Sequence, residues 1–256
     1  MRPELAAFER LVQIIAELRE GCPWDRKQTL ESLRYLTIEE TYELSDAILD
    51  RDLDEVKKEL GDLIMHIVFY AQIGSETHDF TIADVIESVN EKLVRRHPHI
   101  YGDVEVTSEE EVKRNWEKIK LSEGKKSVLE GVPKSLPAMV KANRIQEKAR
   151  GIGFDWDHES QVWDKLMEEI QELKNEIDNK AAKIRIEDEF GDVLFSIINY
   201  ARFIDVNPED ALERTNKKFI KRFQFLEKRS EYLKKDLSDM TLDEMEAIWQ
   251  ESKTKV

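Results

Sequence analysis

Hydrophobic residues recur every three or four positions along most of this chain, which is the spacing of an α-helix. The first such stripe lies in residues 4–19, at Leu5, Phe8, Leu11, Val12, Ile15 and Leu18. The same pattern predicts helices at 30–50, 53–73, 82–96, 138–150, 160–179, 183–204 and 208–234, with a short one at 241–252. The alternation that is typical of strands is not convincing anywhere. The predicted fold class is therefore all-α.

The second half of the chain repeats the pattern of the first half. The segment ELGDLIMHIVFYA at 59–71 returns as EFGDVLFSIINYA at 189–201, an offset of 130 (189 − 59). Upstream, IEETYEL returns as MEEIQEL, an offset of 129 (168 − 39). Because a glycine- and proline-containing stretch separates the copies, we predict two domains, 1–121 and 138–256, joined by a linker at 122–137.

Acidic residues crowd two of the predicted helices in each half. In the first half, Glu39, Glu40 and Glu43 are one turn apart, so like charges face each other at a cost in stability. Glu59 and Asp62 stand where the next helix becomes apolar, and carboxylates there must be protonated, paired or bound to a metal. Ligation by oxygen alone favours Mg²⁺ or Mn²⁺. A solvated acidic face is the alternative interpretation.

A basic pattern follows the acidic one in both halves. It has the form N-x-K-x-x-x-R and consists of Asn90, Lys92 and Arg96, and then of Asn216, Lys218 and Arg222. Carboxylates for a divalent ion, combined with lysine and arginine for phosphoryl oxygens, are the equipment of polyphosphate chemistry. A solvated helix face would also explain one copy, but the recurrence of both patterns in the same order favours the functional interpretation.

The amino-acid composition of the chain argues against several classes of binding partner and site. The formal net charge of −15 argues against nucleic acid or an anionic membrane surface as the main partner. The single cysteine, Cys22, excludes an internal disulfide and a cysteine-based zinc site. The N-terminal residues lack the apolar core of a signal peptide, and the longest apolar runs are too short to span a bilayer. We expect a cytoplasmic protein.

These motifs resemble those of the MazG family of all-α nucleoside triphosphate pyrophosphohydrolases. The resemblance is carried by E-E-x-x-E followed by E-x-x-D, and by GCPWDRKQTLESLRYLTIEETYEL, RRHPHIYGD and GVPKSLPAMVKANRIQEKARGIGFDW, and it covers almost the whole chain. It implies two tandem four-helix MazG-type bundles and a homodimer. It also implies Mg²⁺-dependent hydrolysis of NTPs or dNTPs between the α- and β-phosphates, with Mn²⁺ as a possible substitute, to give a nucleoside monophosphate and pyrophosphate.

The resemblance assigns roles to residues in both halves. Metal ligands would be Glu169, Glu172, Glu189 and Asp192 in the second half, and Glu40, Glu43, Glu59 and Asp62 in the first. Glu168 and its counterpart Glu39 would support the cluster or orient the attacking water. Substrate would be bound by Asn199, Asn216, Lys218, Arg222 and Trp249, and in the first half by Lys92, Arg95, Arg96 and Lys118, with Trp116 a weaker counterpart of Trp249.

Two alternatives remain open at this point. The chain could be a helical regulatory or interaction protein whose acidic clusters are structural or vestigial. If it is an enzyme, both halves or only one could be active. Asn199 follows Asp192 by seven residues and can hydrogen-bond a ligand or a metal-bound water, whereas Phe69 occupies that place after Asp62 and can only pack. This difference predicts that the second half is the principal catalyst.

Overall fold

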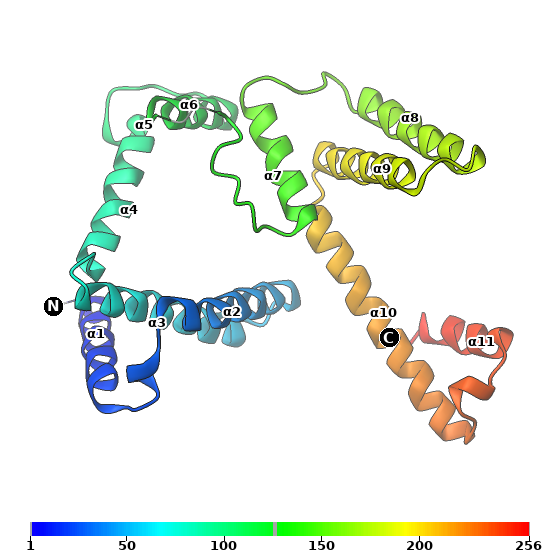
Figure 1. Ribbon diagram of the computed structural model, residues 1–256, viewed down its shortest axis with the longest axis horizontal. Coiled ribbons are helices and arrows are strands. Elements are labelled where there is room, and N and C mark those ends of the chain that lie inside the picture. The colour runs from blue at the N-terminus through cyan, green and yellow to red at the C-terminus, as the bar shows by residue number, and fades with distance from the viewer. Residues whose placement is uncertain (1, 125–126, 256) are drawn as a thin grey trace. The chain divides into compact units, whose positions relative to one another are not determined.

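The computed structural model describes residues 2–124 and 127–255 of the chain, and these residues form helices, turns and loops without a strand. The prediction of an all-α fold is confirmed. The α-helices are α1 (Pro3–Gly21), α2 (Leu30–Asp50), α3 (Leu53–Glu76), α4 (Ile82–Arg96), α5 (Pro98–Tyr101), α6 (Glu109–Ser122), α7 (Ala138–Gly151), α8 (Glu159–Asp178), α9 (Lys183–Phe203), α10 (Pro208–Leu233) and α11 (Leu242–Ser252) (Figure 1). Two short 3₁₀ helices are η1 (Asp25–Lys27) and η2 (Leu237–Asp239).

Side-chain caps fix where several helices begin. Thr29 caps α2, accepting a hydrogen bond from the backbone N–H of Ser32, and Thr81 caps α4 in the same way. The predicted capping box of Thr241 and Glu244 is confirmed at the start of α11. Such caps satisfy backbone N–H groups that have no partner inside the helix. They place the helix boundaries close to those that the sequence pattern predicts.

A tight turn joins the two helices that carry the acidic residues of the first half. Arg51 ends α2 in the left-handed conformation, with φ 58°, and the next residue, Asp52, already caps α3. The chain therefore reverses within two residues, and α2 lies alongside α3 as an antiparallel pair. Lys180, with φ 50°, follows α8 in the second half, where α8 and α9 form the equivalent pair.

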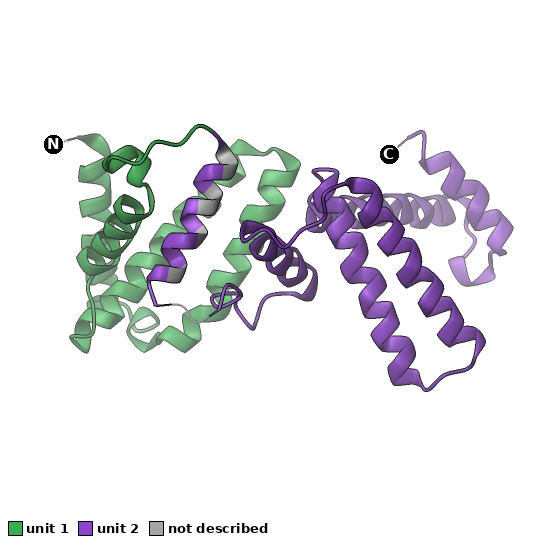
Figure 2. Ribbon diagram, turned by 90° about the horizontal axis from the view of Figure 1, so that it is seen from above, with its two compact units in different colours: residues 1–107 green, residues 108–256 purple. Residues whose placement is uncertain are grey.

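The first of two compact units comprises residues 1–107 (Figure 2). Its core is formed by Ile15 of α1, Leu33 of α2, and Val68 and Phe69 of α3, which all have at most 4% of their surface exposed. α1 therefore covers one side of the α2–α3 pair near the end of that pair opposite the tight turn. The Glu-rich end of the pair, next to the turn, is left outside this core.

The second compact unit comprises residues 108–256 and contains the α8–α9 pair (Figure 2). The side chain of Gln146 in α7 is buried, and its Nε2 donates a hydrogen bond of 2.8 Å to the carbonyl of Phe195 in α9. A separate small core of Leu226, Met240 and Ile248 joins α10 to η2 and α11. The unit thus has two packing centres, one around the helix pair and one at the end of the chain.

The structural division differs from the predicted domain boundaries at α6. The repeat places this helix in the first domain, as the counterpart of α11, whereas the structure groups it with α7 in the second unit. The sequence pattern also gave no helix there, although Val112, Trp116 and Ile119 have helical spacing. The many charged residues between them weaken that signal. The domain bounds 1–121 and 138–256 stay a prediction.

Within the part of the chain that the structure describes, no helix is both long and apolar enough to cross a membrane.

Candidate active site

The α2–α3 pair brings carboxylates from both helices together near its tight turn. Glu40 and Glu43 lie one turn apart on α2, and Glu59 lies opposite them on α3. Each of these three residues offers an oxygen, and the three oxygens lie within 4.8 Å of one another. We call these residues the first cluster. Its assembly follows from helical periodicity plus the antiparallel turn, because both are needed to bring the three positions to one place.

Burial and mutual repulsion make the first cluster a poor place for several negative charges. Glu59 is 8% exposed, and its Oε2 has no hydrogen-bond partner among the described residues. Burial is the main cause that raises the pKa of Glu59, Glu40 and Glu43, and the charges of the neighbouring carboxylates act in the same direction. The ionised form of each of these acids is therefore less favourable than it would be in water. An unpartnered buried carboxylate oxygen is suited to coordinate a hard cation.

The α8–α9 pair repeats this arrangement. Glu169 and Glu172 of α8 and Glu189 of α9 offer oxygens within 4.8 Å of one another, and we call them the second cluster. The surroundings differ in one respect, because the Nζ of Lys165 lies 2.8 Å from Oε1 of Glu168 and 2.8 Å from Oε1 of Glu169. Burial is still the main cause that raises the pKa of Glu172. The ammonium group of Lys165 is therefore a positive charge in direct contact with the second cluster.

The remaining predicted acidic residues lie around these clusters rather than within them. Asp62 is half-buried one turn beyond Glu59, and its charge contributes to the raised pKa of Glu40. Asp192 is exposed and is not one of the three residues whose oxygens converge in the second half. Glu39 and Glu168 are exposed one residue before the clustered positions of α2 and α8. Both clusters contain only oxygen ligands, which fits Mg²⁺ or Mn²⁺ rather than a thiolate-seeking metal.

The predicted phosphate-binding residues of the second half lie on α10. Lys218 is exposed and Arg222 is half-buried, with an Nε that is buried without a hydrogen-bond partner in the described part of the chain. Between them, Phe219 packs against Trp249 of α11, with ring centroids 5.0 Å apart. The structure therefore brings the predicted base-stacking tryptophan to the helix that carries the basic pair. Asn216 is exposed and donates a hydrogen bond to Glu213.

These basic residues do not lie at the acidic cluster of their own half. Figure 1 shows α10 running away from the α8–α9 pair, and α4 running away from the α2–α3 pair. In the first half, Lys92 and Arg95 are exposed on α4, and Arg96 is half-buried at its end. The acids of each cluster lie together, whereas among the described residues α4 and α10 run away from the clusters, so the substrate-binding roles of these basic residues stay a prediction.

The first-half counterpart of Trp249 has a different environment. Trp116 of α6 is half-buried, and the Nζ of Lys120 lies 4.9 Å from its ring centroid. A cation over an indole face occupies the surface on which a base would stack. Lys118, the other residue predicted there, is exposed. The resemblance between the two tryptophan segments therefore does not extend to how the rings are packed.

Asn199 is held by a residue that sequence reasoning missed. Its Oδ1 accepts hydrogen bonds from Nε of Arg202 at 3.2 Å and from a terminal nitrogen of that guanidinium at 2.8 Å. Arg202 is in turn paired with Asp155 at 2.8 Å. The oxygen of Asn199 is thus engaged within the protein, and only its amide N–H groups remain to contact a ligand. The i,i+3 spacing of Asn199 and Arg202 is the signal that could have indicated this pairing.

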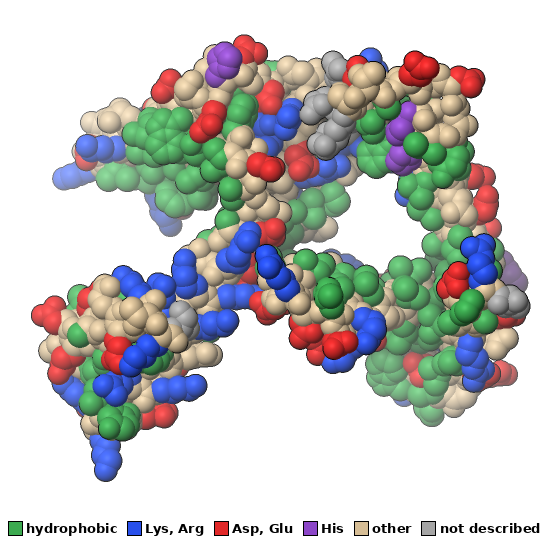
Figure 3. All heavy atoms as spheres, turned by 180° about the vertical axis from the view of Figure 1, so that it is seen from behind, with side chains coloured by type: hydrophobic (Ala, Val, Ile, Leu, Met, Phe, Trp, Pro, Cys, Tyr) green, Lys and Arg blue, Asp and Glu red, His purple; other side chains and the backbone are tan. Residues whose placement is uncertain are grey.

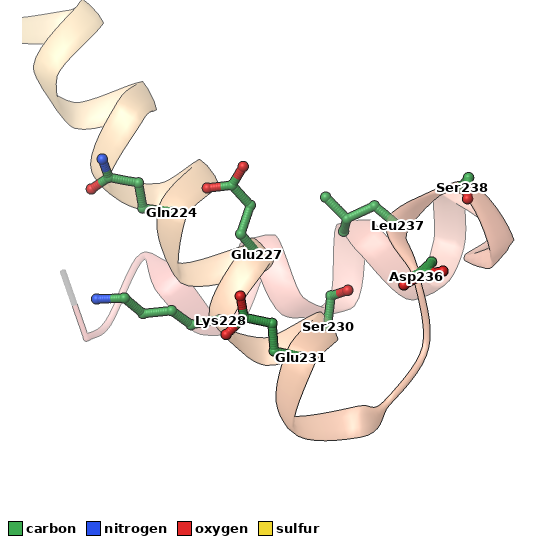
Figure 4. Close-up of a pocket in the computed structure, with 8 residues that line it drawn as sticks. All are labelled: Gln224, Glu227, Lys228, Ser230, Glu231, Asp236, Leu237 and Ser238. Atoms are coloured by element: carbon green, nitrogen blue, oxygen red, sulfur yellow. The ribbon is translucent and has the colours of Figure 1, made fainter.

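A hollow of ≈ 870 Å³ lies elsewhere in the second unit, between the last turns of α10 and η2 (Figure 4). Glu227, Lys228 and Glu231 of α10 line it, together with Leu237 and Ser238 of η2. No carboxylate of either cluster belongs to its lining. Its own acids, Glu227, Glu231 and Asp236, are not among the described carboxylates whose oxygens converge within 4.8 Å, so the acidic clusters are the better candidates for the reacting site.

Comparison with known proteins agrees with this placement. The chain matches the MazG nucleotide pyrophosphohydrolase domain family twice, at residues 28–101 and 158–225, and each match includes one cluster. It is 45% identical over 254 residues to the Thermotoga maritima nucleoside triphosphate pyrophosphohydrolase/pyrophosphatase MazG, covering 96% of this chain and 95% of that one. It is 38% identical to an Escherichia coli K12 nucleoside triphosphate pyrophosphohydrolase, covering 96% and 97%.

In a third relative, a similar sequence forms part of a longer protein. The chain is 45% identical over 251 residues to the uncharacterized protein YabN of Bacillus subtilis, covering 96% of this chain but 51% of the relative. In the two enzymes named above, by contrast, nearly the full length is shared. The sequence matched by this chain therefore makes up nearly the whole of two relatives and about half of the third.

Proposed function

The chain belongs to the MazG nucleotide pyrophosphohydrolase family, and on this premise we propose that it hydrolyses nucleoside triphosphates with the help of Mg²⁺. The bond broken is the one between the α- and β-phosphates, and the products are a nucleoside monophosphate and pyrophosphate. The observation that supports this proposal most directly is the three-carboxylate cluster that two antiparallel helices build in both halves of the chain. Mn²⁺ would serve as a substitute, because it accepts the same oxygen ligands.

Each group of residues has a separate task in the proposed reaction. Glu169, Glu172 and Glu189 would hold the ion, with Asp192 at the edge of the cluster. An ion held there would neutralise polyphosphate charge and favour ionisation of the attacking water. Glu168, which is exposed one residue before Glu169 and pairs with Lys165, would orient this water and accept its proton.

The basic helix would bind the substrate itself. Lys218 and Arg222 would contact the phosphate oxygens, and the buried unpartnered Nε of Arg222 has a donor to offer. Trp249, packed against Phe219, would give the base an aromatic surface on which to stack. Stacking accepts any base, so this arrangement favours a broad substrate range.

The product distinguishes this reaction from other triphosphate hydrolyses. We expect that ATP, the other ribonucleotides and the deoxyribonucleotides, incubated with the protein and Mg²⁺, yield monophosphate and pyrophosphate in equal amounts. Anion-exchange chromatography of the nucleotides and separate assays of pyrophosphate and orthophosphate provide the measurement. Formation of ADP and orthophosphate would contradict the proposal. Binding of Mg²⁺ without any turnover would instead favour the alternative of a helical interaction protein.

We also propose that the working form is a homodimer. Leu60, Ile64 and Ile67 make a stripe along α3 in which each side chain is 44–48% exposed. At the repeat offset of 130, the corresponding residues of α9 are Phe190, Leu194 and Ile197, which are 45–54% exposed. Figure 3 shows large hydrophobic areas at the molecular surface. Apolar stripes of this kind next to an acidic cluster favour a partner surface, and a second copy supplies the same surface together with the basic helices.

Charged substitutions in the stripes should prevent dimer formation. We expect the wild-type chain, with a mass of 30.1 kDa, to sediment at about twice that mass. Combining Ile64→Asp with Leu194→Asp should give a folded monomer, because a carboxylate facing an apolar partner surface is strongly disfavoured. Tyr232→Asp is the matched control, since Tyr232 is 75% exposed outside both stripes. A monomeric wild-type chain, measured by analytical ultracentrifugation, would contradict the proposed dimer.

The proposed substrates are metabolites of the cytoplasm, and a single cysteine that is half-buried without a second thiol suits a reducing compartment. We propose that the enzyme acts there.

A further inference from the structure

The two acidic clusters differ in how their charge is balanced. In the second cluster, Lys165 contacts Glu168 and Glu169 at 2.8 Å each. At the offset of 129 that relates the acidic motifs, the first-half counterpart of Lys165 is Leu36 (165 − 129), which packs against the core of the first unit. One copy of the motif thus carries a cation one turn before its acids, and the other carries a core leucine.

No other cation takes this place in the first half. Among the residues that the structure describes, no lysine or arginine forms an ion pair with Glu40, Glu43 or Glu59. Lys58 is adjacent to Glu59 in sequence, but its Nζ pairs with Glu55, at 2.8 Å from Oε2. The first cluster must therefore balance its charge with protons or with a metal, whereas the second has an ammonium group in contact with a prospective metal ligand.

The ion pair between Lys165 and Glu169 is one that the lysine can leave in order to contact another anion. Glu169 is the most buried acid of the second cluster, with 9% of its side chain exposed, whereas the side chain of Lys165 is 36% exposed. A lysine stem is long and flexible, so its ammonium can move to another anion nearby while the helix stays fixed. A divalent ion bound by Glu169 would repel this ammonium, and the phosphates of a substrate would attract it.

We propose that Lys165 is a displaceable counter-cation that makes metal binding in the second half depend on the polyphosphate. It holds Glu168 and Glu169 in the metal-free protein, weakens the binding of free metal, and turns to the phosphate oxygens when a metal–polyphosphate complex binds. The first half has Leu36 at this position and therefore lacks the counter-cation, so its cluster binds free metal directly. This inference rests on the proposed function, because it assumes that a polyphosphate is the ligand of the second cluster.

The test compares two ligands in one variant. Lys165→Met is made in a Glu59→Gln background, so that the second cluster dominates metal binding. Free Mn²⁺ is titrated and measured by electron paramagnetic resonance, and the Mn²⁺ complex of an α,β-methylene triphosphate is titrated by calorimetry. We expect Lys165→Met to bind free Mn²⁺ about tenfold more tightly and the Mn²⁺–analogue complex about tenfold more weakly, because one neighbouring positive charge acts with opposite sign on a cation and on an anion.

Opposite changes in the affinities for free Mn²⁺ and for the Mn²⁺–analogue complex would exclude simpler roles of Lys165. A lysine that only supports the fold would weaken both affinities when it is replaced, and a lysine that only repels metal would strengthen both. Either result, or no change in the affinity for free Mn²⁺, would overturn the proposal. Lys165→Arg should keep the wild-type behaviour, because it keeps the charge. All these titrations measure binding without turnover, so they are independent of whether pyrophosphate is formed.

The first half allows the converse experiment. Leu36→Lys in a Glu189→Gln background should weaken the binding of free Mn²⁺ by the first cluster, again about tenfold, because it introduces the missing charge. Leu36→Met is the matched control, since it changes the shape of the side chain without adding charge. Circular dichroism of both variants establishes that the fold is kept. Equal Mn²⁺ affinity in the two variants, with the fold intact, would contradict the proposal.

Discussion

Removal of divalent ions is expected to lower triphosphate hydrolysis by roughly three orders of magnitude, the equivalent of about 4 kcal/mol of lost transition-state stabilisation. The reason is the composition of both clusters, in which carboxylates converge within 4.8 Å. Carboxylates and phosphates repel each other, and the single ammonium group of Lys165 beside the second cluster does not balance several negative charges, so a divalent cation is needed between them. Pyrophosphate release after treatment with EDTA is the measurement, and addition of excess Mg²⁺ or Mn²⁺ should restore it.

The same experiment has a pH dependence of known sign. Burial and repulsion raise the pKa of Glu40, Glu43 and Glu59 in the first cluster and of Glu172 in the second, which strengthens the competition of protons with an incoming ion. Because protons and metal compete, the Mg²⁺ concentration needed for half-saturation should fall as the pH rises through these raised pKa values. Persistent pyrophosphate release in EDTA, or metal affinity independent of pH, would contradict the assignment of these acids as ligands.

The parts of the site that the sequence predicted are those fixed by local geometry. Helical periodicity puts Glu40 and Glu43 on one face of α2, and the short connection to α3 forces an antiparallel neighbour that carries Glu59. The repeat then transfers this arrangement to α8 and α9. Likewise, Thr241 and Glu244 cap α11 through bonds between near neighbours in sequence. Each of these inferences needs only residues that are close together along the chain.

The parts that the sequence did not predict depend on competition between side chains or on packing between distant elements. Asn199 was expected to hydrogen-bond a ligand or a metal-bound water, but its oxygen is engaged by Arg202, which also pairs with Asp155. The contact of Lys165 with Glu169 was not predicted, because the sequence pattern does not show which of several nearby acids a flexible lysine pairs with. The directions of α4 and α10 and the exposure of the apolar stripes of α3 and α9 depend on packing between distant elements, which the local spacing of residues does not encode.

Different environments in the two halves lead to an expected asymmetry of activity. Phe69 is 4% exposed within the core of the first unit, so this position offers no polar group to a ligand. Its counterpart Asn199 is half-buried and keeps its amide N–H groups for a ligand. Trp249 lies against Phe219 beside Lys218, whereas Trp116 lies under Lys120. These differences favour the second half as the principal catalyst.

Glu189→Gln is therefore expected to reduce pyrophosphate release by about a hundredfold or more, since loss of one charged metal ligand removes a few kcal/mol of transition-state stabilisation. Glu59→Gln should leave most of the activity in place. Both variants are assayed separately on several ribo- and deoxyribonucleoside triphosphates. Glu227→Gln is the matched control, because Glu227 is an exposed acid on α10 outside both clusters, and it should behave as wild type. Near-complete loss from Glu59→Gln, with Glu189→Gln nearly harmless, would reverse the assignment.

The stability of the same variants separates a metal ligand from a structural ion pair. The pKa of Glu59 is raised mainly by burial, so its ionised form is less favourable in the folded protein than in the unfolded chain. The folded state gains stability from this group as the pH falls and loses it as the pH rises through the unfolded and then the raised folded pKa. Glu59→Gln should therefore increase the melting temperature of the metal-free protein at neutral pH and reduce the stabilisation that Mg²⁺ adds. A large decrease in the metal-free melting temperature would instead show that Glu59 holds the fold together.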